Sequence, residues 1–160
     1  MQVRVLKFGG SSLAGTDQIE AAAARVAEIT DAGFSPIVVV SAMRGITDQL
    51  LALARRIHAD APGDELDRLL ATGEAQVATF LALALQQRGL SARSFSGGEA
   101  GIQTDPCFGR ARIQDINTSP LAASVAAGEI PVVTGFQGQT RDGRITTLGR
   151  GGSDTTAVAL

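Results

Sequence analysis

VRVLKFGGSS, residues 3–12, gives the first indication of the fold of this sequence. Residues 3–8 form a short apolar run rich in β-branched side chains, which predicts a buried strand. Residues 9–12 predict a loop, and residues 17–32 predict a helix with its apolar side chains near one face. This stretch therefore opens an alternation of strand and helix that continues along the chain.

The rest of the sequence repeats that alternation. The predicted strands are residues 37–40, 92–95, 112–116 and 130–134, with a hairpin over 139–147. The predicted helices are residues 47–58, 64–88 (interrupted at Gly73), 119–127 and 153 onward, while 96–110 is predicted to be irregular. This pattern favours an α/β fold, a three-layer αβα sandwich with a mostly parallel central sheet. Because the last helix is still running at residue 160, we expect the natural domain to continue beyond it.

Composition excludes several classes of function. Apolar residues make up 44% of the chain, charged residues 19%, and the net charge is −2. Without clustered Lys and Arg, and without Trp or Tyr, no nucleic-acid partner is expected. The single cysteine, Cys107, and the single histidine, His58, predict neither a disulfide nor a metal site. No signal peptide and no apolar run of membrane-spanning length are apparent, so a cytoplasmic location is expected.

The first candidate site follows the first strand. Lys7 closes the strand, and Gly9 and Gly10 allow backbone N–H groups to approach phosphate oxygens. The alternative is a tight strand-to-helix turn with a surface lysine.

Two further candidates carry polar groups next to apolar segments. Ser41 and Thr47 follow the second strand, at the carboxyl edge where open α/β sheets bind ligands; alternatively, Thr47 caps the next helix. Glu74 lies in a long apolar helical region, where a buried carboxylate is costly unless it is paired. It is interpreted either as a ligand for a substrate ammonium or as part of a solvated helix face.

The strongest signal is TTLGRGGSDTT, residues 146–156. Its glycines expose backbone donors, and the start of a helix adds positive potential. Arg150 could hold a carboxylate through two parallel hydrogen bonds. Asp154 could orient the glycine-loop amides or hold Mg²⁺. A simple helix cap is the alternative, but it does not explain eleven such residues.

These sites occur in an order that resembles the amino-acid kinase superfamily, and aspartate kinases within it. The resemblance spans nearly the whole chain, and residues 146–157 are its most specific part. It implies the amino-acid kinase fold, with residues 1–160 as the N-terminal, aspartate-binding portion of a catalytic domain. Sequences around 38–43, 72–74, 92–95, 100–102 and 135–138 also carry it.

The resemblance implies transfer of the ATP γ-phosphate to the aspartate side chain, the first step toward lysine, threonine and methionine. Lys7 would stabilise the transferring phosphoryl group, with Gly9, Gly10 and Ser11 at the phosphates. Asp154 would organise the lysine and the glycine loop. ATP with Mg²⁺ is the implied co-substrate. No general base is needed, because the attacking carboxylate is already ionised.

The resemblance also implies the aspartate pocket. Glu74 would receive the amino group of aspartate and Arg150 its α-carboxylate. The residues implied to border the pocket are Ser41, Thr47, Phe136 and Ser153.

Some features depart from the family or leave alternatives open. The adenine contacts, a second phosphate-binding lysine and the regulatory domains would lie beyond these 160 residues, and Ala75 stands where some relatives carry Arg. A catalytically incomplete aspartate-binding or dimerisation module is therefore the alternative to an enzyme. A kinase for acetylglutamate is less favoured, because an acetylated amine offers no charge to Glu74. A homo-oligomer is expected for the full-length parent.

Overall fold

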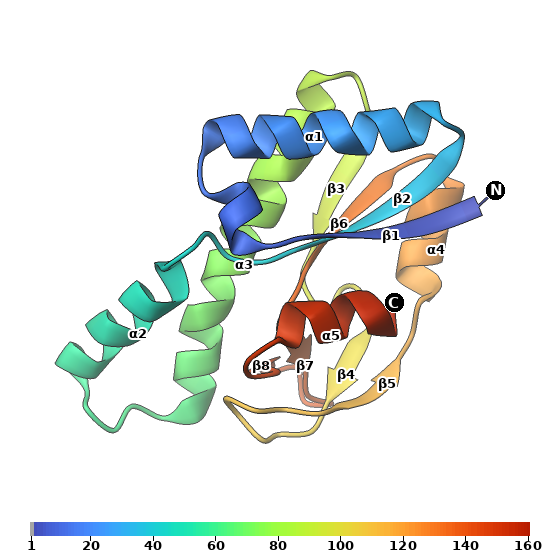
Figure 1. Ribbon diagram of the computed structural model, residues 1–160. Helices are drawn as coiled ribbons and strands as arrows, with labels where there is room; N and C mark the ends of the chain where they lie inside the picture. The colour runs from blue at the N-terminus through green and yellow to red at the C-terminus, as the bar shows by residue number, and fades with distance from the viewer. Residues whose placement is uncertain (1) are drawn as a thin grey trace.

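The computed structural model describes residues 2–160. Its main sheet has four strands, all parallel, in the order β1-β2-β6-β3 (Figure 1). Phe8 pairs with Val40, and Val40 pairs with Thr134, so the carboxyl ends of three strands meet at one edge. The strands are β1 (Gln2–Phe8), β2 (Phe34–Val40), β3 (Ala92–Phe95) and β6 (Ile130–Thr134).

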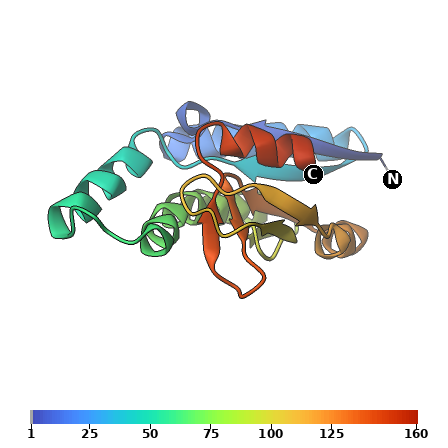
Figure 2. The ribbon, with the colours of Figure 1, turned by 90° about the horizontal axis from the view of Figure 1, so that it is seen from below.

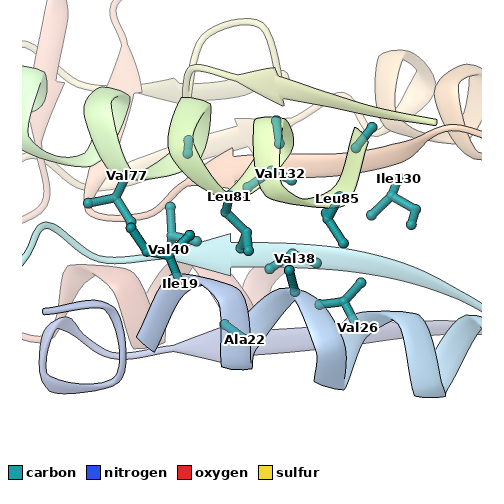
Figure 3. Close-up of a cluster of buried hydrophobic side chains, with 14 of the residues drawn as sticks. Ile19, Ala22, Val26, Val38, Val40, Val77, Leu81, Leu85, Ile130 and Val132 are labelled. Carbon is teal, nitrogen blue, oxygen red and sulfur yellow. The ribbon is translucent and has the colours of Figure 1, made fainter. Parts of the chain in front are cut away.

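Helices cover both faces of this sheet. The long helices α1 (Thr16–Asp31) and α3 (Gly63–Gln87) pack on one face, and α4 (Ser119–Ala126) and α5 (Gly152–Ala159) contribute to the other (Figures 1 and 3). The predicted αβα layering is confirmed.

The apolar run in β2 explains why both faces can be covered. Val38 and Val40 enter the core beneath α1 and α3, whereas Ile37 and Val39 enter the core on the opposite face. Successive strand residues point to opposite faces, so a continuous apolar run fits a strand buried on both sides. Figure 3 shows the first of these cores, where side chains of α1 and α3 meet beside β2.

A second sheet was not predicted. It has four strands in the order β5-β4-β7-β8 and mixes parallel and antiparallel pairs. The hairpin prediction is confirmed by β7 and β8, but the prediction that 96–110 is irregular is wrong for β4, whose three residues are too few to show a periodic pattern. The strands are β4 (Ile102–Thr104), β5 (Ile113–Ile116), β7 (Gln137–Gln139) and β8 (Ile145–Thr147).

The segments after β1 and β2 also differ from prediction in detail. Residues Gly10–Leu13, predicted as a loop, form a short 3-10 helix, η1. Helix α2 (Ile46–Ile57) projects at one end of the molecule beside the first half of α3 in Figures 1 and 2, and it has no buried residue. Its N-cap is Gly45, with φ 83°, so Thr47 is not the cap. A left-handed backbone there favours glycine.

Helix α3 runs through Gly73 without the predicted interruption. A Cβ at Gly73 would lie 3.0 Å from the Cβ of Ala42 and 3.4 Å from Cγ2 of Ile46, so the missing side chain lets the loop after β2 approach the helix. By length and composition, α3 is also the one helix among residues 2–160 that could cross a membrane. Its place against α1 and β2 identifies it as a core helix, a type that passes the same test.

Candidate functional site

Two loops lie against each other at the carboxyl edge of the main sheet. A Cβ at Gly10 would overlap the carbonyl oxygen of Ala42, and the Arg44 amide donates to the Gly10 carbonyl at 3.3 Å. The Ser41 amide donates to the Phe8 carbonyl at 3.2 Å, which joins the two strand ends. Gly10 is therefore required because the loop after β2 occupies the space of a side chain.

The predicted phosphate residues come together at this edge. Lys7 Nζ lies 2.8 Å from Asp154 Oδ1, across 147 positions of sequence. A Cβ at Gly9 would lie 3.6 Å from the same Nζ, so the ammonium sits beside the glycine loop. The side chains of Lys7 and Asp154 remain 30% and 70% exposed, which leaves the ammonium accessible to an anionic ligand.

The start of α5 packs against the end of β6. A Cβ at Gly135 would lie 2.7 Å from the Ser153 side chain, and one at Gly152 would lie 2.9 Å from the Phe136 ring. Phe136 has φ 70°, a costly conformation for a residue with a side chain. Its amide donates to Thr156 Oγ1 at 3.2 Å and its carbonyl accepts from the Leu148 amide at 2.8 Å, which together hold that conformation.

Glu74 is buried, so the solvated helix face is excluded. Its side chain projects from α3 to the loop after β2, where Oε1 accepts the Ala42 amide at 3.2 Å. Oε2 is buried without a hydrogen-bond partner among the described residues. Burial raises the pKa of Glu74 to about 7, against the opposing effect of the Ala42 amide. A buried carboxylate with an unpaired oxygen favours the binding of a cation that also carries hydrogen-bond donors.

The other predicted site residues make few side-chain contacts with Lys7, Asp154 or Glu74 among the described residues. Ser41 is half-buried beside Ala42, whereas Ser11 is exposed on η1. Thr47 lies in the first turn of α2, and no side-chain hydrogen bond within residues 2–160 ties it to the other predicted residues. Arg150 is exposed between two glycines of positive φ, and its guanidinium has no hydrogen bond or ion pair with the described part of the chain.

Sequence reasoning missed the polar contacts made by the first half of α3. Asp67 is 1% exposed and accepts hydrogen bonds from Gly109 and Thr147, while the Ala71 carbonyl accepts from Gln137 Nε2 at 3.0 Å. Asp67, Ala71 and Glu74 follow an i, i+4, i+7 pattern, which puts them on one helix face. That periodicity was the available signal, and it was obscured by the leucines at 66, 69 and 70.

No cluster of three or more His, Cys, Asp or Glu side chains within residues 2–160 could hold a metal ion. The arrangement instead combines the accessible Lys7 ammonium, partly exposed glycine backbone, a helix N-terminus and the buried Glu74 carboxylate. The first three suit a phosphate group and the last suits a substrate cation.

Comparison with known proteins places this chain in a family. The amino acid kinase family model matches residues 2–160. The chain is 49% identical over its whole length to Aspartokinase 2 of Bacillus subtilis (strain 168), and 42% identical to the aspartokinase of Thermus thermophilus. It spans 39% and 40% of the length of those two relatives.

Solved structures agree in fold. The aspartate kinase of Synechocystis superposes with a TM-score of 0.80 at 39% identity, over 99% of this chain and 26% of that one. E. coli aspartokinase III, in a complex with aspartate and ADP, superposes with a TM-score of 0.82 at 24% identity, over 100% of this chain and 47% of that one.

Proposed function

The chain belongs to the amino acid kinase family, and from this premise we propose that it serves in ATP-dependent phosphorylation of the L-aspartate side-chain carboxylate. The product would be 4-phospho-L-aspartate, an intermediate on the way to lysine, threonine and methionine. Relatives named aspartokinase, 42–49% identical over the whole of this chain, support the choice of acceptor. A cytoplasmic location is part of the proposal.

The observation that carries the proposal is the unpaired oxygen of Glu74. A free α-amino acid presents an ammonium with three donors. Oε2 of Glu74 is buried and unpaired, while Oε1 is held by the Ala42 amide. Glu74 is therefore proposed to bind the substrate ammonium and Arg150 to bind the α-carboxylate, with Ser41, Thr47, Phe136 and Ser153 around them. An acetylated amine would leave the carboxylate without a counter-charge.

The proposed phosphate-binding site is built around Lys7 and its ion-pair partner, Asp154. In the proposed reaction, an aspartate β-carboxylate oxygen bonds to the γ-phosphorus as the bond to the β–γ bridging oxygen breaks, and ADP leaves. Lys7 would neutralise the phosphoryl oxygens, Gly9, Gly10 and Ser11 would lie at the phosphates, and Asp154 would hold the ammonium in place at 2.8 Å. Mg²⁺ would arrive with ATP and share that charge.

The extent of the chain favours a second candidate. Because residues 1–160 span 39% of the B. subtilis relative, they are proposed to be the aspartate-binding portion of a catalytic domain. Taken alone, this portion could bind aspartate or join subunits of a homo-oligomer without transferring phosphate.

Two measurements test these proposals. Isothermal titration of the 160-residue chain with L-aspartate, and with N-acetylglutamate as the contrast, measures the pocket. ADP formation with ATP, Mg²⁺ and L-aspartate, by this chain and by the complete gene product that contains it, measures transfer. Aspartate binding without ADP formation by the chain supports the binding-module candidate for residues 1–160. No aspartate-dependent ADP from the complete gene product contradicts the kinase proposal.

A further inference from the structure

We propose that Asp67 is a positioning residue that fixes the loop carrying Arg150 and thereby sets the affinity for the α-carboxylate of the substrate. This inference rests on the proposed function. Asp67 lies seven residues before Glu74 on α3, on the same face and roughly 10 Å away along the helix axis. One face of one helix would then serve both charged ends of the amino acid.

The contacts of Asp67 converge on the end of β8. Its Oδ2 accepts the Thr147 amide at 2.7 Å and its Oδ1 accepts the Thr147 hydroxyl at 2.8 Å. The Gly109 amide donates to both oxygens, at 3.0 and 2.9 Å. The Thr147 carbonyl in turn accepts from the Ala111 amide at 2.8 Å. The amide, hydroxyl and carbonyl of Thr147 are therefore all occupied.

Thr147 lies three positions before Arg150. Between them, the Leu148 amide donates a hydrogen bond to the Phe136 carbonyl, and Gly149 and Gly151, on either side of Arg150, take left-handed conformations. The Arg150 side chain itself has no hydrogen bond or ion pair within residues 2–160. The backbone therefore sets the position of the Arg150 side chain relative to Glu74. Asp67 is the charged group that anchors that backbone to α3.

The chemistry of Asp67 suits a residue that positions a loop in addition to stabilising the fold. It is buried without a cation within ion-pair distance in the described chain, and neutral donors alone satisfy it. Apolar side chains of similar volume are often at least as stabilising as buried charges. A carboxylate, however, can accept from several converging donors at once and so fix two segments that lie 42 and 80 positions away.

The test compares steady-state kinetics of the complete gene product as wild type, D67N, T147V and E65Q. Asparagine keeps the size of Asp67 but puts an NH₂ opposite one N–H donor, and valine removes only the Thr147 hydroxyl. E65Q is the matched control, because Glu65 is an exposed carboxylate on the same turn of α3.

We expect D67N to raise the KM for aspartate roughly tenfold and T147V about threefold, because D67N disturbs the contacts to both segments whereas T147V removes only one of the three donors. The KM for ATP and both constants of E65Q should stay within about twofold.

A folded D67N that leaves the KM for aspartate unchanged, or that raises both KM values equally, overturns the inference. Where D67N does not fold by circular dichroism, T147V decides: a selective rise in the aspartate KM supports positioning, and no rise overturns it. A wild-type protein without aspartate-dependent ADP formation overturns the proposed function and this inference together. An active wild type with an unaffected D67N overturns this inference alone.

Discussion

Two buried carboxylates on one face of α3 have opposite surroundings. Asp67 meets three donors from two distant segments, at distances between 2.7 and 3.0 Å. Glu74, two turns later, meets one donor from another residue and keeps one oxygen unpaired. Both are almost completely buried, at 1% and 3% exposure.

Asp67 has hydrogen-bond donors at both oxygens within the protein and joins three segments of the fold. Glu74 keeps one buried oxygen without a partner among the described residues, which leaves that oxygen available to a ligand. Asp67 is already satisfied, so its removal should damage the folded state. Glu74 lacks a partner for Oε2 and has its pKa raised by burial, so its charge costs stability until a ligand cation arrives.

The largest effect is expected from D67A. The substitution leaves the amide and hydroxyl donors of Thr147 buried and unpaired, so the free energy of unfolding should fall by about 3–5 kcal/mol. Urea denaturation of the purified protein measures it. E65A is the control and should change stability by less than about 0.5 kcal/mol. A loss from D67A as small as that of E65A would remove the structural half of the contrast.

The next effect concerns the loop anchored by Asp67. R150A should weaken apparent aspartate binding by on the order of 2–5 kcal/mol, because a bidentate contact is lost and the substrate carboxylate is left unpaired. K7A should differ by mainly lowering kcat, since its charge is most useful as the phosphoryl group transfers. Kinetics with each substrate varied separate the two. An R150A variant with a raised KM for ATP alone would show that the pocket is misassigned.

The raised pKa of Glu74 predicts that the stability of the folded protein depends on pH. Burial raises the pKa of Glu74 to about 7 in the folded protein, against 4.5 for an exposed glutamate, so the folded state binds more protons between these values. Stability therefore falls as pH rises from about 4.5 to 7, by up to roughly 3 kcal/mol at 1.36 kcal/mol per unit. Comparing denaturation of wild type and E74Q across pH 5–8 isolates this contribution. Equal slopes for the two proteins would argue that Glu74 does not titrate in this range.

The same titration should appear in ligand binding, with the opposite direction. An ammonium needs the ionised carboxylate, so aspartate affinity should increase as pH rises toward 7 and then level off. E74Q should bind weakly at every pH and lose this dependence. Titration calorimetry in two buffers with different ionisation enthalpies would also detect the proton that binding releases below pH 7.

The sequence could predict the layers because each rests on a local pattern. The continuous apolar run 37–40 and the helical periodicity of 17–32 each identify a buried element locally, and the glycines beside Lys7 indicate a loop close to other backbone. Strand β5 and the β7–β8 hairpin were predicted, but their assembly into a second sheet was not, since β4 has three residues and joins β5 to β7 by pairing across the fold. Asp67 was missed for a related reason: its partners lie 42 and 80 positions away.

The smallest effect tests how closely the Glu74 region is packed. In G73A the new Cβ would lie 3.0 Å from the Ala42 Cβ and 3.4 Å from Ile46 Cγ2, so the loop after β2 must shift by a few tenths of an ångström. Alanine favours a helix by about 1 kcal/mol over glycine, while overpacking costs about 1–3 kcal/mol, so the net loss should be about 1 kcal/mol. The exposed substitution A75G measures the helix preference alone. Because the shifted loop carries the Ala42 amide that holds Glu74, G73A should also raise the KM for aspartate severalfold while leaving that for ATP nearly unchanged. A stabilised G73A with normal aspartate kinetics would mean that the loop yields freely, and that the approach of Ala42 to α3 does not set the position of the Glu74 carboxylate.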